Sequence, residues 1–170
     1  MEAKGVNTYI TTGTIEYLTK LKENIYDEKL VLMNNPNGSL LLHETTGSSV
    51  FKEPRRYEVI KALAEFPNEG FAALYNIPVT EEGRPLFEHL VIKLIEQMGN
   101  EPGLMALRLL RPLSSQTFIF LTAWSERKNF QSWRNTEAFL QLSDPKAYIY
   151  HNQPKIFTSS PYVSEYFLVE

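Results

Sequence analysis

The stretch that decides the fold is FAALYNIPV, residues 71–79. Its side chains alternate in the way that a β-strand presents residues to two opposite faces. One face would carry residues 71, 73, 75, 77 and 79, and the other residues 72, 74, 76 and 78. Both faces are mostly apolar, so we expect a strand that is buried on both sides.

The chain that follows this strand alternates helices and strands. Apolar residues at helical spacing predict a helix over 84–98, and strands are expected over 104–112 and 117–124. A second helix from Ser125 should carry Phe130, Trp133 and Leu140 and end at Asp144-Pro145, before a closing strand over 161–169. The order β-α-β-β-α-β predicts an α+β, ferredoxin-like domain of the dimeric α/β-barrel type over residues 68–170.

Residues 1–67 are predicted to form a smaller β-α-β-β-α half-domain packed on the rest. Thr14 can cap a helix, and Asn34-Asn35-Pro36-Asn37-Gly38 lies between two apolar runs as a hairpin turn does. Pro54 suits the first turn of a last helix that carries Tyr57, Ile60 and Leu63. The second sheet face also needs cover, so we predict a homodimer, although this N-terminal half could cover part of that face instead.

Composition excludes several classes of function. The 170 residues carry a net charge of −3 without a basic run, which argues against nucleic acid as a partner. No cysteine is present, which excludes disulfides, thiolate metal sites and cysteine nucleophiles. No apolar run is long enough to span a bilayer, and no leader pattern is visible, so we expect a soluble cytoplasmic protein without a membrane partner.

Common catalytic motifs are also missing. The sequence has no GxxxxGK[ST] or GxGxxG phosphate loop and no HExxH metal motif. A serine–histidine–aspartate triad has no nucleophile-elbow motif to support it.

Two residues of the second half stand out for their chemistry. Asn76 is the one strongly polar side chain on a strand face of Ala, Leu and Pro. It either bonds neighbouring backbone or points into an apolar cleft of the kind that binds small molecules. Trp133, one turn after Phe130, is either a core residue or a flat wall for an aromatic ligand. The residues alone leave both questions open.

At this point a resemblance becomes visible. Tyr75-Asn76-Ile77 and the run from Trp124 to Trp133, WSERKNFQSW, resemble the antibiotic-biosynthesis-monooxygenase (ABM) domain, and more closely its IsdG-type haem-degrading branch. Over nearly the whole chain, YEVI at 57–60, EGRPLFE at 82–88 and LRP at 110–112 are similar to the group that contains the HmoB haem monooxygenases and the TRAP signal proteins.

The resemblance implies a specific chemistry. In that branch haem is both substrate and cofactor, and oxygen with an external reductant, which a reductase can supply, opens the porphyrin and releases iron. Asn76 matches the asparagine near the iron-bound oxygen, and Trp133 the tryptophan that distorts the ring, with Phe130 beside it as a further contact. The axial histidine is not matched.

The position of that histidine is Ser143, ten residues after Trp133. A serine hydroxyl is a poor ligand for haem iron compared with imidazole. His151, Tyr148 and Tyr150, all beyond the helix, are candidate replacements, whereas His89 is expected on a solvent face beside Glu88.

Three functions therefore remain as hypotheses. The first is a haem-binding, haem-degrading monooxygenase with an altered ligand site. The second is a non-catalytic, TRAP-like signalling or stress protein that acts through protein contacts. The third is a cofactor-independent ABM monooxygenase acting on a small aromatic substrate.

Overall fold

The computed structural model describes residues 5–143 and 156–170. Over these residues the elements follow in the order β-α-β-β-β-β-α-β-β-α-α-β. The strands are β1 Asn7–Gly13, β2 Leu30–Asn35, β3 Gly38–Thr45, β4 Arg55–Leu63, β5 Gly70–Pro78, β6 Leu104–Pro112, β7 Thr117–Trp124 and β8 Tyr162–Val169. The helices are α1 Ile15–Asn24, α2 Arg84–Glu96, α3 Arg127–Arg134 and α4 Glu137–Ser143.

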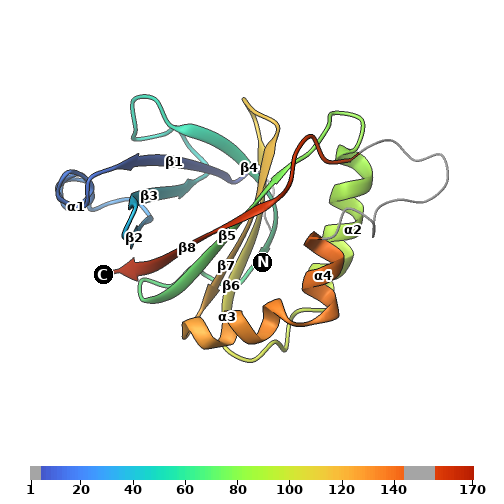
Figure 1. Cartoon of the computed structure of the whole chain (residues 1–170). Helices are drawn as coiled ribbons and strands as arrows, with labels where there is room; N and C mark the ends of the chain where they lie inside the picture. The colour runs from blue at the N-terminus through green and yellow to red at the C-terminus, as the bar shows by residue number, and fades with distance from the viewer. Residues whose placement is uncertain (1–4, 144–155) are drawn as a thin grey trace.

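The strands form one closed barrel in the order β1-β3-β2-β8-β5-β7-β6-β4. All neighbouring strands pair antiparallel. Helices α2, α3 and α4 lie on one side of the barrel and α1 lies on the other (Figure 1). Closure removes the free sheet edges that would otherwise remain unpaired.

Each surface of the barrel wall has its own apolar cluster. The interior is filled from both halves of the chain, for example by Met33 and Leu40 together with Leu74 and Ile119. Outside, α2, α3 and α4 pack against β5, β6 and β7. The outer face of β1, β2 and β3 packs against α1 through Leu18 and its neighbours.

The helix predicted after Pro54 was wrong, because residues 55–63 form β4. Tyr57 and Val59 point into the barrel, the register shifts between Val59 and Lys61, and Ala62 points inward again. The shift places Ile60 and Leu63 on the outer face, against the helix-covered cluster. The bulge in this strand gives its apolar residues the three-residue spacing that is typical of a helix. Pairing with β1 and β6 makes the segment a strand.

The inner face for which the sequence required cover is covered within the chain. Strand β2 pairs with β8, and β4 pairs with β6, so the N-terminal strands complete the barrel. Cover comes from the N-terminal half, so this face does not require the predicted homodimer, which stays a prediction. The division of the chain into an N-terminal unit, residues 1–67, and a C-terminal unit, residues 68–170, stays a prediction.

The second predicted helix is interrupted. α3 ends at Arg134 and α4 begins at Glu137. Thr136 stabilises the break, since its Oγ1 donates to the Trp133 carbonyl at 2.6 Å and accepts the Phe139 amide at 3.4 Å. The ten residues from Trp133 to Ser143 therefore do not lie along one straight helix.

Candidate functional site

Trp133 lies inside an aromatic cluster on the outer side of the barrel. Its side chain is only 2% exposed. Its ring lies 5.1 Å from Phe139, 5.7 Å from Trp124, 6.1 Å from Phe120 and 6.4 Å from Phe130, measured between centroids. The arrangement is that of a core tryptophan, held on several sides by aromatic rings of the chain itself.

The indole nitrogen of Trp133 is the unusual feature of this cluster. Nε1 is buried and has no hydrogen-bond partner among the described residues. A buried donor without a partner costs free energy, on the order of 1–3 kcal/mol. The nitrogen of the neighbouring Trp124, by contrast, donates to Thr122 Oγ1 at 2.8 Å.

Asn76 lies on β5 and is 5% exposed. Its Nδ2 is within hydrogen-bond distance of three acceptors: the Leu74 carbonyl at 3.1 Å, Ser164 Oγ at 3.2 Å and the Tyr162 carbonyl at 3.3 Å. The amide is thus bonded to its own strand and to β8. This is the backbone-bonding arrangement that the sequence offered as one of two interpretations.

The barrel wall separates Asn76 from Trp133. Asn76 shares its strand face with Ala72 and Leu74, which belong to the interior cluster. Its neighbour Tyr75 points outward, with its ring 5.3 Å from that of Phe139. One planar ligand cannot lie against both side chains, because a β-sheet stands between them.

The remaining predicted site residues add little to a haem site. Phe130 is 2% exposed and packs on Phe71 and Trp124. Ser143 is the last residue of α4. His89 is exposed on α2, as expected from the sequence. His151, Tyr148 and Tyr150 lie outside the described residues.

The described residues do not fit a bound haem. The three predicted contacts are already engaged: two inside an aromatic cluster, and one inside the barrel with its hydrogen bonds made. Within residues 5–143 and 156–170, no three histidine, aspartate or glutamate side chains lie close enough to hold a metal ion.

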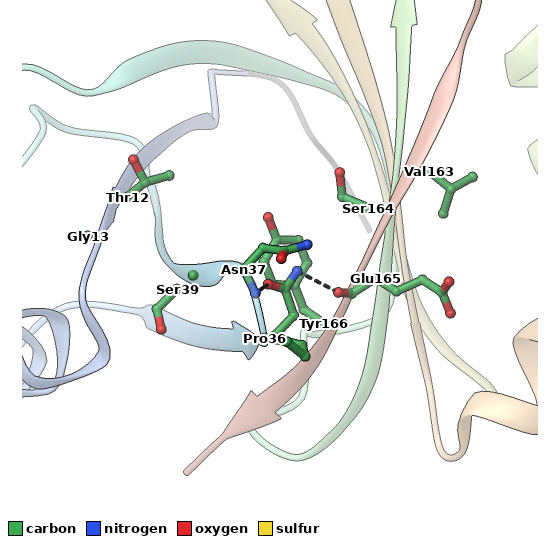
Figure 2. Close-up of a pocket in the computed structure, with 11 residues that line it drawn as sticks. Thr12, Gly13, Pro36, Asn37, Ser39, Val163, Ser164, Glu165 and Tyr166 are labelled. Carbon is green, nitrogen blue, oxygen red and sulfur yellow. Dashed lines mark hydrogen bonds between the residues drawn. The ribbon is translucent and has the colours of Figure 1, made fainter.

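Sequence reasoning missed a polar pocket of about 640 Å³ at one end of the barrel. Its walls come from the end of β1, the β2–β3 turn and β8, including Thr12, Asn35, Ser164 and Tyr166. Figure 2 shows the Ser164 side chain directed to the same side as these walls, with Glu165 directed the opposite way. The signal that was available is a run of polar residues at inward positions of strand ends.

Comparison with known proteins identifies the family. The chain belongs to the antibiotic biosynthesis monooxygenase family, whose model matches residues 71–144. Signal transduction protein TRAP of Staphylococcus aureus (strain USA300) is 30% identical over 131 residues, which cover 77% of this chain and 78% of that protein. TRAP of S. aureus (strain MRSA252) is 28% identical over 159 residues, covering 94% and 92%.

Solved structures support the same fold. A structure described as a major regulator of staphylococcal pathogenesis has a TM-score of 0.82 and 27% identity, covering 96% of this chain and 98% of that one. A haem-degrading enzyme from Listeria monocytogenes has a TM-score of 0.76 at 20% identity, covering 95% and 98%. At that identity the second likeness shows the fold alone. None of the described helices has the length and apolar character needed to cross a membrane.

Proposed function

We propose that this chain is a non-catalytic member of the monooxygenase family that acts through protein contacts, as the name of its TRAP relatives suggests. One observation carries the proposal: Asn76 and Trp133 point to opposite sides of the barrel wall and are both engaged by the chain itself. Ser143 in place of the family's histidine supports it further.

Titration with haemin tests the proposal directly. Purified protein at micromolar concentration should give no saturable shift of the Soret band. The variant Ser143→His sharpens the test, because it restores the imidazole that the resemblance requires. If packing closes the site, the variant should behave like the parent protein.

A haem-degrading monooxygenase is the second candidate, and the unpartnered Nε1 of Trp133 favours it. A buried donor without an acceptor is typical of a position that a ligand or a rearrangement completes. The fold shared with a haem-degrading enzyme is compatible with this candidate. Oxygen and an external reductant would then be required, and a redox partner would have to supply electrons.

The same titration separates the two candidates. Saturable haemin binding at one per chain, followed by bleaching of the Soret band and iron release with ascorbate in air, would establish the second and overturn the first. His151→Ala would then test the iron ligand, because an unchanged Soret position would exclude that histidine. A cofactor-independent reaction on a small aromatic substrate is left without an observation that favours it.

A further inference from the structure

The inside of the barrel changes character along its axis. Its middle is filled by apolar side chains such as Ile10 and Met33. At the end where β4 and β8 begin and β1 and β2 finish, the inward positions are instead polar. They are Thr12, Asn35, Arg55, Tyr162, Ser164 and Tyr166.

The opposite end of the barrel is closed. Arg108 is 1% exposed, and its guanidinium bonds Glu44 at 2.6 Å and the carbonyls of Leu63 and Ala64 at 3.2 and 2.7 Å. Phe66 lies over the same guanidinium, 5.9 Å from its ring centroid. A molecule that enters the barrel must therefore do so at the polar end.

The pocket at the polar end is large enough for a metabolite. Its volume of about 640 Å³ is within the range of small-molecule sites, which often occupy the mouths of barrels. Hydrogen bonds fix its walls: Asn35 Nδ2 donates to the Glu165 carbonyl at 2.9 Å, and Asn76 Nδ2 to Ser164 Oγ at 3.2 Å. The pocket is thus held in shape before any ligand arrives.

The one acidic residue among the described residues that line the pocket turns its carboxylate outward. The Glu165 carboxylate is directed away from the pocket (Figure 2) and pairs with Arg127 on the outside at 2.9 Å. Arg55 is not one of the residues that line the pocket, but it lies at an inward position of β4, opposite Ile10, at the same end of the barrel. It is exposed and hydrogen-bonds the Tyr57 side chain. Its charge has no carboxylate partner among the described residues.

Two tyrosines at inward positions, Tyr57 and Tyr166, lie within electrostatic reach of this cation. Burial raises the pKa of both Tyr57 and Tyr166. The charge of Arg55 lowers each pKa in part, and the nearby Tyr162 raises each of them further. Tyrosine hydroxyls are protonated at neutral pH even at their ordinary pKa, so both can donate hydrogen bonds. Arg55 and the tyrosine hydroxyls together resemble the donor sets that bind carboxylates.

We propose that this end of the barrel binds a small organic carboxylate that carries hydroxyl groups. The carboxylate pairs with Arg55, and the hydroxyl groups bond the amides and hydroxyls of Asn35, Thr12 and Ser164. The site lies on the other side of the barrel wall from Trp133, but it adjoins Asn76, which bonds the pocket residue Ser164.

Calorimetric titration with gluconate tests the proposal, with glucose and butyrate as probes that lack the charge or the hydroxyl groups. Gluconate should bind saturably and more tightly than either. Arg55→Gln should weaken gluconate binding about tenfold or more, the usual worth of a charge-assisted hydrogen bond. Arg56→Gln is the matched control, because Arg56 lies on the outer face over the Tyr9 ring, 5.8 Å from its centroid.

A second variant guards against an indirect effect. Thr12→Trp should fill the pocket and abolish gluconate binding, and thermal unfolding should show that each variant remains folded. The proposal is overturned if gluconate gives no saturable heat at millimolar concentration. Equal binding of gluconate and glucose, or equal loss in the Arg55 and Arg56 variants, would overturn it as well.

Discussion

The side chains of Asn76 and Trp133 are separated by the barrel wall itself: the first bonds Ser164 inside the barrel, and the second stacks on Phe120 outside it. The family resemblance assigns both residues to one haem. In the described structure each has a separate structural role, and each role can be measured.

Replacing Trp133 with alanine should destabilise the protein strongly. The indole fills the centre of an aromatic cluster, and large-to-small changes of this kind cost about 3–5 kcal/mol. Urea unfolding would measure the loss, with the exposed Ser132→Ala as a control that changes stability little. A small cost for Trp133→Ala would indicate that the indole is loosely held, as a ligand wall would be.

Asn76→Ala should cost about 1–3 kcal/mol of unfolding free energy, because it removes a buried donor and leaves its acceptors with fewer partners. Chemical denaturation gives the value. Asn37→Ala, in the exposed β2–β3 turn, is the matched control and should be nearly neutral. Unchanged stability in the Asn76 variant would show that the fold does not need this side chain, and would favour a role for it in ligand binding.

The sequence was sufficient for the local geometry of β5 but not for its surroundings. Alternation over 71–79 correctly separates Asn76 from Tyr75, because the two faces of a strand follow from backbone geometry alone. Which face of β5 the helices cover depends on tertiary packing. With both faces apolar, the sequence could not show that the helices pack on Tyr75 and that the barrel encloses Asn76.

Strand β4 and the barrel ends were missed for a related reason. A register shift after Val59 gives Tyr57, Ile60 and Leu63 the spacing of a helix, and only pairing with β1 and β6 reveals the strand. The buried Arg108 lies within an otherwise apolar run, and its partner Glu44 is distant in sequence. Such contacts depend on closure of the barrel and have no local signal.

Two glutamates pair with arginines of β6, and only the pair of Glu44 with Arg108 lies at the closed end of the barrel. Glu44→Gln should destabilise by about 3–5 kcal/mol, because it leaves the charge of Arg108 buried without its counter-ion. Glu58→Gln should cost no more than about 1 kcal/mol, since its pair with Arg111 is largely solvated. Equilibrium unfolding measures the loss of unfolding free energy in each variant. Equal losses would show that the buried charge of Arg108 does not need Glu44 as its counter-ion.

Closure within one chain also predicts the state of the protein in solution. The inner face that would have required a second copy is covered by β1 to β4, so light scattering should show a particle near the chain mass of 19.6 kDa. The measurement should not depend on concentration over the micromolar range. A stable dimer would mean that an outer surface, such as the one around the exposed Phe167, forms the interface.

The tyrosines of the polar end predict a loss of stability in alkali. Burial raises the pKa of Tyr57 above its usual value of 10.0, so above pH 10 the folded chain holds a proton that the unfolded chain has released. Unfolding free energy should therefore be constant below that pH and fall as pH rises through the folded-state pKa. Tyr57→Phe should remove part of this fall, whereas Tyr26→Phe, at a residue that is 93% exposed, should not. Urea unfolding between pH 8 and 11 measures both slopes, and identical slopes would mean that Tyr57 ionises freely in the folded protein.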